Sequence, residues 1–346
     1  MKKEQPFAEK IIGKLREQIK GKRTGFLLGS GASSLDGRGY PLTTDLWLSI
    51  KEFVLPNDRD QIETKLQSGC ENLERALDAL DNDGRSDFPL RHRVSCAINK
   101  CFRNLTPPLD VHRKFVVGLA TRTERRVPVF TLNYDPLVEL AGDLECQLVI
   151  DGFCGTLNSY FKHACFYDYH ALPECRRGRT VAVTVRGTIN LYKLHGSMGW
   201  YLDCDNIARR VSPGTSVPEK WIPLLIPPQN RKTSDTGYAP YAALWSEFRG
   251  VLANDSTRLL SRLICVGYSM GDGHVNAVIQ SALARPHFTL VIMARNLSEE
   301  IFRRWVQFKN VILATEKCCS LFGEEGPGIR DGWSFEWLAK EVGSHG

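Results

Sequence analysis

The chain has 346 residues, of which 42% are hydrophobic and 24% are charged. These values are typical of a globular protein that buries a large core, either as one domain with insertions or as two domains. Lysine and arginine number 45 and aspartate and glutamate 39, which gives a net charge of +6. Because the basic residues form short, scattered clusters, we expect no direct binding of nucleic acid.

Neither a membrane span nor a disulfide framework is expected. No apolar run approaches the roughly 20 residues that cross a bilayer, and the N-terminus lacks the apolar segment of a signal peptide. The 11 cysteines include no Cys-x-x-Cys pair, which favours reduced thiols in the cytoplasm and no structural metal. His163 and His170 near Cys165 keep a zinc site open as an alternative.

The first elements expected in chain order are a helix and a strand. Residues 7–20 carry apolar side chains at helical spacing, so residues 1–22 are expected to form an N-terminal helix that packs on the domain or on a partner subunit. A short apolar strand over 25–28 runs into five small residues. Such residues turn tightly and can present backbone N–H groups to an anion, although a plain strand–helix turn has the same composition. They are Gly29, Ser30, Gly31, Ala32 and Ser33.

Two insertions interrupt an alternation of strands and helices. Residues 56–110 have a polar helical pattern and are expected to form a helical insertion, a candidate lid, whereas residues 143–188 are irregular. The remaining apolar strands each end in small or polar residues. This alternation predicts an α/β fold over residues 23–346, with a Rossmann-like, mostly parallel sheet and a site at the carboxyl ends of its strands. The strands are expected over 127–132, 189–194, 259–266, 288–293 and 311–314.

Polar residues follow several of these strands. Asn133 and Asp135 come directly after the 127–132 strand, where they either bind a ligand or only cap the next helix. His195 follows the 189–194 strand in the same way. Ser269 lies in a Gly-x-Ser-x-Gly sequence, which leaves a serine hydrolase as an alternative. That alternative is not favoured, because the histidines after Ser269 are unsuitably placed for the Ser–acid–His order of α/β-hydrolases: His274 is too close to the serine, His287 is at a strand start and His345 is one residue from the end.

Four strand ends together resemble the sirtuin-like family, and most closely its bacterial branch that degrades NAD in antiphage defence. They are residues 29–33, 131–135, 193–197 and 267–272, and the resemblance covers residues 24–296, with residues 227–232 also similar to that branch. It implies an NAD site assembled across the sheet, with Asn133 and His195 as its catalytic residues. The resemblance implies that NAD is held by Gly29, Ser30, Gly31, Ala32, Ser33, Asp135, Gly267, Ser269, Asp272 and Asn296.

The resemblance also implies a reaction. After His195 the chain lacks the paired Cys-x-x-Cys zinc module of protein-deacylating sirtuins. Water is therefore the expected nucleophile, with NAD as the substrate, nicotinamide and ADP-ribose as the products, and no metal. The alternatives on the same scaffold are a sirtuin-type protein deacylase, an ADP-ribosyltransferase, and a non-catalytic NAD-binding assembly subunit.

The expected biological setting follows from that reaction. A cytoplasmic effector that depletes cellular NAD must be held inactive until infection. We therefore expect a homo-oligomer, or control by a co-encoded partner such as a HerA-type ATPase or an Argonaute-like protein. The N-terminal helix and the 56–110 insertion are the expected contact surfaces.

Overall fold

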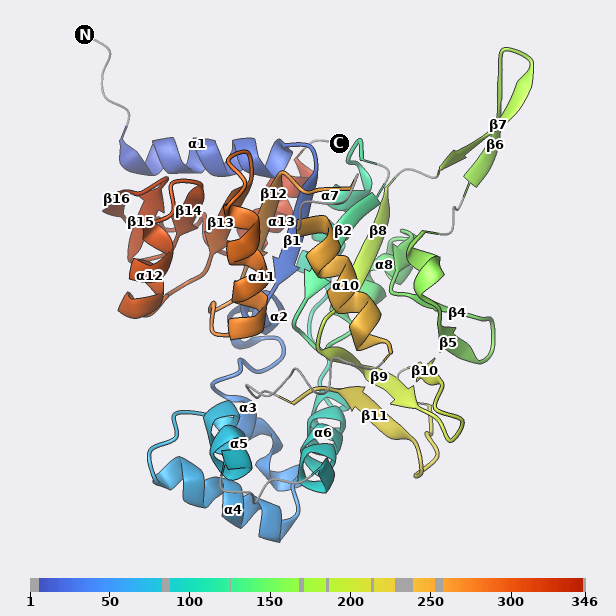
Figure 1. The fold of residues 1–346 in the computed structure, drawn as a ribbon, viewed down its shortest axis with the longest axis vertical. Helices are drawn as coiled ribbons and strands as arrows, with labels where there is room; N and C mark the ends of the chain where they lie inside the picture. Colours follow the sequence, from blue (N-terminus) through green and yellow to red (C-terminus); the bar gives the residue numbers. More distant parts are fainter. Residues whose placement is uncertain are drawn as a thin grey trace.

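The structure is a computed structural model that describes residues 6–82, 88–124, 126–167, 171–184, 187–212, 215–227, 239–252 and 258–344. Its centre is a nine-stranded sheet in the order β16-β15-β14-β13-β12-β1-β2-β8-β3 (Figure 1). Neighbouring strands from β14 to β3 are all parallel. Only β15 and β16, at one edge, pair antiparallel. The predicted α/β fold with a mostly parallel sheet is therefore confirmed.

The central strands are short apolar segments. Both faces of β1 and β12 are buried, which explains why their sequences are continuous apolar runs without alternation. Strands β15 and β16 were not expected from the sequence. The bounds are β1 Thr24–Leu28, β2 Arg126–Thr131, β3 Val149–Ile150, β8 Thr188–Lys193, β12 Arg262–Val266, β13 Thr289–Met293, β14 Val311–Ala314, β15 Cys318–Leu321 and β16 Glu324–Pro327.

Helices cover both faces of this sheet (Figure 1). Successive side chains of a strand point to opposite faces, so Phe26 and Leu28 lie in one core cluster while Leu27 lies in the other. The cluster with Phe26 includes α1 Phe7–Lys20, α7 Asp110–Ala120, α8 Leu137–Leu144 and α13 Phe335–Gly343. The opposite cluster includes α10 Tyr241–Leu252, α11 Gly273–Leu283 and α12 Glu299–Val306.

Further helices lie beyond the carboxyl ends of the strands (Figure 1). They share a third core cluster. This cluster also contains Tyr134 from the loop after β2, Leu137 at the start of α8, and Met198. This shared cluster fixes the helices against the end of the sheet where strand-end side chains gather. The helices are α3 Leu46–Ile50, α4 Pro56–Gln67, α5 Leu73–Asn82 and α6 Phe88–Arg103. Short 3-10 turns elsewhere in the described chain include Leu35–Gly37 and His163–Phe166, and a further one, Lys51–Phe53, follows α3.

A second, smaller sheet lies beside these helices. Its order is β11-β9-β10-β5-β4, and its neighbouring strands are antiparallel. A separate hairpin of β6 and β7 projects from the body (Figure 1). The bounds are β4 Phe153–Cys154, β5 Ser159–Phe161, β6 Ala171–Arg176, β7 Arg179–Thr184, β9 Gly196–Leu202, β10 Ala208–Arg210 and β11 Ile222–Leu225.

His163, one of the residues considered for zinc, pairs with a carboxylate instead. Its Nε2 lies 2.8 Å from Oε1 of Glu247, and Arg258 donates to the other carboxylate oxygen at 3.1 Å. His170 lies outside the described residues. Within the described ranges, no group of three His, Cys, Asp or Glu side chains is arranged to hold a metal ion.

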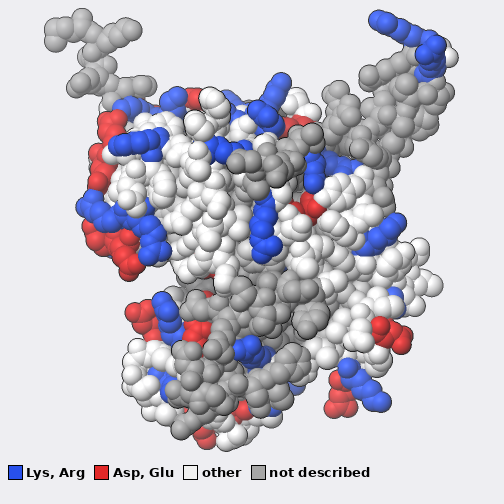
Figure 2. All heavy atoms as spheres, in the orientation of Figure 1, with Lys and Arg blue, Asp and Glu red and all other residues white. Residues whose placement is uncertain are grey.

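The surface is charged in a mixed way. On the face shown in Figure 2, acidic and basic side chains alternate around the rim, and neither sign forms a continuous field. In the part of the chain that is described, every helix is too short or too polar to cross a membrane.

The buried histidine of α7 makes stability sensitive to acid. Burial lowers the pKa of His112 from 6.5 to about 4, although the charges of Asp135 and Asp110 act in the opposite direction. His112 therefore stays neutral in the folded state at pH values where it is protonated in the unfolded chain.

We expect His112→Gln to remove part of the acid destabilisation. Between pH 6.5 and pH 4 the unfolded state binds a proton that the folded state does not, so lowering the pH favours unfolding by about 3 kcal/mol. Urea unfolding at pH 7 and pH 4 measures the effect in both proteins. Between pH 7 and pH 4, the free energy of unfolding should fall by about 3 kcal/mol less in the variant than in the wild type. Equal decreases would show that His112 is not the source of this acid sensitivity.

Candidate functional site

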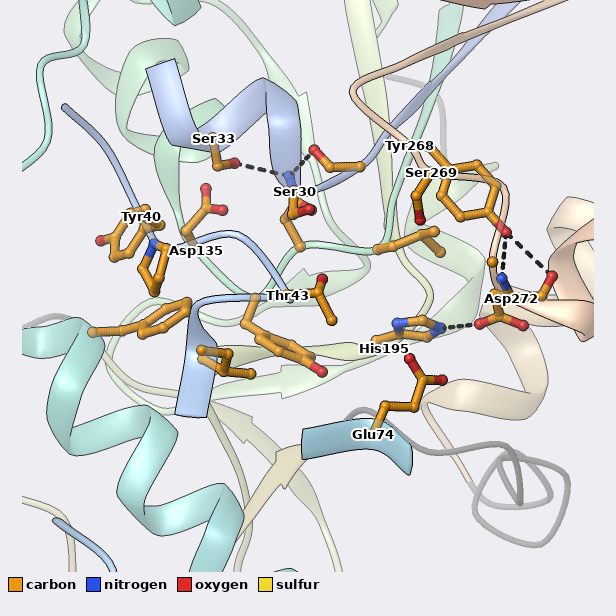
Figure 3. Close-up of a pocket in the computed structure, with 18 residues that line it drawn as sticks. Ser30, Ser33, Tyr40, Thr43, Glu74, Asp135, His195, Tyr268, Ser269 and Asp272 are labelled. Carbon is orange, nitrogen blue, oxygen red and sulfur yellow. Dashed lines mark hydrogen bonds and ion pairs between the residues drawn. The ribbon is translucent and has the colours of Figure 1, made fainter. Parts of the chain in front are cut away.

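A pocket lies where the carboxyl ends of β1, β2, β8 and β12 meet the helices beyond the sheet (Figure 3). The cavity has a volume of about 120 Å³ and is open to solvent on one side. Polar groups from several strand ends and apolar groups from the helices share its wall. The lining residues are Gly29, Ser30, Ser33, Tyr40, Pro41, Thr43, Leu46, Glu74, Phe102, Leu132, Asn133, Tyr134, Asp135, His195, Tyr268, Ser269, Gly271 and Asp272.

Two glycine-containing loops pack backbone against backbone on one side of the pocket. Gly29 precedes the short helix α2, Ser30–Ser34, and the N–H of Gly31 donates to the carbonyl of Gly267 at 2.9 Å. Gly267 has a φ of +64°, and a Cβ there would lie 2.4 Å from the backbone nitrogen of Ala32. The glycines are therefore required for the contact between the loops, in addition to any contact with an anion.

We expect Gly267→Ala to separate these loops and to destabilise the protein by about 1–3 kcal/mol, because a side chain is strained at this φ and has no space. Gly273→Ala, at the start of α11, is the matched control, since nothing lies within 4 Å of a Cβ there. Thermal unfolding of both variants measures the difference. Equal stabilities would show that the loops accommodate the added methyl group.

Asn133 connects the second strand to the glycine loop. Its Nδ2 donates to the carbonyl of Gly29 at 2.9 Å and to the hydroxyl of Ser33 at 2.8 Å. Its backbone N–H donates to the hydroxyl of Thr131 at 3.0 Å. The side chain therefore reaches across to a neighbouring strand end and does not cap the helix that follows.

Asp135 does act at the start of that helix. Its Oδ1 accepts from the N–H of Leu137 at 3.1 Å, while its backbone carbonyl accepts from Nζ of Lys193 at 2.5 Å. Lys193 is fully buried and also donates to Glu139 at 2.7 Å. Burial raises the pKa of Glu139, and the ammonium of Lys193 opposes this shift. The ammonium of Lys193 therefore links the end of β8 both to the loop after β2, through Asp135, and to α8, through Glu139.

His195 and Asp272 form the most direct polar contact across the pocket. The Nε2 atom of His195 lies 3.2 Å from Oδ2 of Asp272 (Figure 3), and both side chains are less than a tenth exposed. The other oxygen of Asp272 accepts from the N–H groups of His274 and Val275 and so caps α11. A carboxylate here holds the ring in one orientation and stabilises its protonated form.

The backbone around His195 is fixed by the neighbouring elements. Its carbonyl accepts from Ile226, and the preceding carbonyl, that of Leu194, accepts from Nε1 of Trp245 at 3.1 Å. Gly196 has a φ of +79°, and a Cβ there would lie 2.1 Å from the carbonyl oxygen of Leu224. A glycine is thus required at position 196 by the adjacent strand β11.

The structure brings together most, but not all, of the residues that the sequence singled out. Gly31, Ala32 and Gly267 support the loops from behind the pocket wall, and Asn296 is exposed and does not line it. Residues 228–232, which also carried the resemblance, lie outside the described residues. Of the residues that the sequence singled out, those that line the pocket are Gly29, Ser30, Ser33, Asn133, Asp135, His195, Ser269 and Asp272.

Several wall residues were not foreseen. Tyr40, Thr43 and Leu46 follow the glycine loop, while Glu74 and Phe102 come from α5 and α6. Nothing in their local sequence distinguishes them, because helical periodicity identifies a buried face but not which site the helix end will reach.

Comparison with known proteins assigns the family. The sequence model of the SIR2-like domain matches residues 127–312, which is more than half of the chain. The chain belongs to the SIR2-like family. The matched range of this SIR2-like protein contains Asn133, His195 and Asp272, whereas the glycine loop at 29–33 precedes it.

Solved structures similar to this SIR2-like protein include Sir2 homologues. One is a Sir2 homologue–NAD complex, with 15% identity, a TM-score of 0.48, and coverage of 95% of this chain and 93% of that one. Another is a variant Sir2 homologue in complex with ADP-ribose, with 15% identity, a TM-score of 0.45 and coverage of 95% of both chains. No curated protein matches the chain.

Proposed function

We propose that this SIR2-like protein is an NAD⁺ glycohydrolase that releases nicotinamide and ADP-ribose. The observation that carries the proposal is that Asn133 and His195, from different strands, line one pocket with the glycine loop. Open α/β sheets bind nucleotides at the carboxyl ends of their strands, where this pocket lies. Gly29, Ser30 and Ser33 in the wall are the proposed contacts for the phosphates, with Gly31 and Ala32 supporting them.

The remaining NAD contacts stay as predicted from the family resemblance. We assign Asp135 to the nicotinamide side and Ser269 and Gly267 to the adenosine side. Asp272, which the resemblance names among the NAD contacts, touches His195, so we propose that it acts through that ring. Asn296 lies outside the pocket wall and would reach the ribose only from the rim.

The proposed reaction is a displacement at C1′ of the nicotinamide ribose. The bond from C1′ to the nicotinamide nitrogen breaks, and its electron pair neutralises the pyridinium ring as positive charge develops on the ribose. Water forms the new bond to C1′, and its proton passes to His195 and then to solvent. Asp272 stabilises the imidazolium that results, while Asn133 orients the water and the ribose hydroxyls.

The direct test is to incubate the purified chain with NAD and to follow nicotinamide and ADP-ribose by chromatography. Equal amounts of both products are expected. ADP-ribose attached to protein would instead indicate a transferase, and 2′-O-acyl-ADP-ribose formed with an acylated peptide would indicate a deacylase. Binding of NAD without any product, both by the chain alone and with a co-encoded partner, would indicate a non-catalytic subunit.

The serine-hydrolase alternative can be tested at Ser269, because this residue is exposed and lines the same pocket as His195. In the structure, however, Nε2 of His195 lies against Asp272, and Asp272 and His195 are not in the chain order of α/β-hydrolases. A fluorophosphonate probe that labels Ser269 would support a serine hydrolase and contradict NAD hydrolysis as the main activity.

We further propose that the protein is a cytoplasmic antiphage effector whose activity is controlled by assembly. Unregulated cleavage would deplete NAD in the cell that makes the protein. Light scattering of the chain alone, and with a co-encoded HerA-type ATPase or Argonaute-like protein, tests this part. A strict monomer that cleaves NAD at full rate would contradict control by a homo-oligomer or a partner.

A further inference from the structure

Helix α5 brings a carboxylate into the pocket that the proposed reaction has not used. Glu74 is half-buried, lines the pocket, and belongs to the helices beyond the sheet rather than to a strand end. Figure 3 shows its carboxylate pointing from α5 toward the His195 ring, from the side opposite Ser30 and Ser33. A ligand held between the glycine loop and His195 would therefore have Glu74 on its other side.

The packing of α5 holds Glu74 in this place. Leu73, Ala76 and Leu77, which flank it on the helix, are each no more than 1% exposed. They belong to the core cluster that also contains Tyr134, the residue between Asn133 and Asp135. Helix α5 and the loop that carries Asn133 are thus packed into one apolar core cluster, which positions Glu74 relative to that loop.

The charge of Glu74 acts on the pocket wall. Burial is the main reason why the pKa of Tyr268 is raised, the charge of Asp272 adds to the shift, and Glu74 contributes as well. For Tyr134, burial again raises the pKa most, and Glu74 is the largest charge effect. The Glu74 carboxylate therefore exerts its field inside the site and not only toward solvent.

We propose that Glu74 is a third catalytic residue, whose carboxylate faces the nicotinamide ribose and stabilises the positive charge at C1′ while the bond to nicotinamide breaks. This rests on the proposed NAD hydrolysis and adds no step to it, because the electron pair still goes to nicotinamide and the proton of water to His195. Glycoside-cleaving sites use carboxylates in this way against an oxocarbenium-like centre. A group that acts on charge present only in the transition state raises kcat more than it lowers KM.

Glu74 also makes the reaction depend on the position of α5. Asn133 and His195 are carried by strand ends, whereas Glu74 reaches the pocket only while α5 is packed in the core cluster that contains Tyr134. A movement of α5 away from the strand ends would therefore take the Glu74 carboxylate out of the site.

The test compares Glu74→Gln and Glu74→Asp with a control, Glu71→Gln. Glu71 is exposed and lies just before α5, so the control removes the same charge near the same helix. For Glu74→Gln we expect kcat for NAD to fall about 10²-fold, with KM and the Kd for ADP-ribose changed less than about threefold. Glu74→Asp keeps the charge on a shorter side chain and should retain more activity than Glu74→Gln. Glu71→Gln should match the wild type.

The outcomes separate this inference from the proposed function. A wild-type chain that releases no nicotinamide, either alone or with its co-encoded partner, would overturn both. If the wild type cleaves NAD and Glu74→Gln keeps its kcat, the inference fails while the function stands. A rise in KM at constant kcat would make Glu74 a binding residue and would also overturn the catalytic assignment. A thermal unfolding curve unchanged from the wild type shows that a loss of kcat is not a loss of fold.

Discussion

His195→Ala is expected to reduce NAD cleavage by about 10²–10⁴-fold, the contribution of a positioned general base. The substitution removes the proposed acceptor for the proton of the attacking water, and Asp272 loses the ring nitrogen that lies 3.2 Å away. The backbone should remain in place, because its hydrogen bonds to Ile226 and Trp245 do not involve the side chain.

Nicotinamide release under saturating NAD measures this effect, and circular dichroism with thermal unfolding verifies the fold. His287→Ala is the matched control, since His287 is exposed next to β13 and away from the pocket. The control should retain wild-type turnover. If His195→Ala is folded and cleaves NAD at the wild-type rate, the imidazole is not the base and the proposed mechanism is wrong.

Asn133→Ala is expected to lower NAD turnover by about 10²-fold, because a displacement of about 1 Å in a reacting group has an effect of that size. The substitution removes the two hydrogen bonds of Nδ2 to Gly29 and Ser33, so it releases the glycine loop as well as the group that orients water. We therefore expect kcat to fall and KM to rise.

Ser33→Ala helps to divide these two effects, since it removes only one of the two acceptors of Nδ2. We expect it to raise KM with a smaller change in kcat than Asn133→Ala produces. Asn104→Ala, at an exposed position outside the pocket, serves as the control for the chemical change. Turnover of Asn133→Ala equal to that of Asn104→Ala would remove Asn133 from the catalytic site.

Much of the fold could be predicted because the central strands are buried on both faces. Runs such as residues 25–28 and 290–293 have no polar position, as is typical of strands covered by helices on both sides. The antiparallel β15 and β16 were missed because they are short and rich in glycine, glutamate and cysteine. Helices α7 and α12 were missed as well, although α12 begins with a serine cap and glutamates in its first turn.

By itself, the sequence determined which polar residues lie near the ends of strands, because each follows an apolar run within a few residues. Only the tertiary structure decided which of them meet. The strand order β12-β1-β2-β8 brings Asp272 to His195 and Asn133 to Gly29, and it leaves Asn296 outside the pocket wall. Glu74 reaches the site through a helix packed from another part of the chain. Such contacts depend on strand order and on apolar packing between distant segments, which local periodicity does not encode.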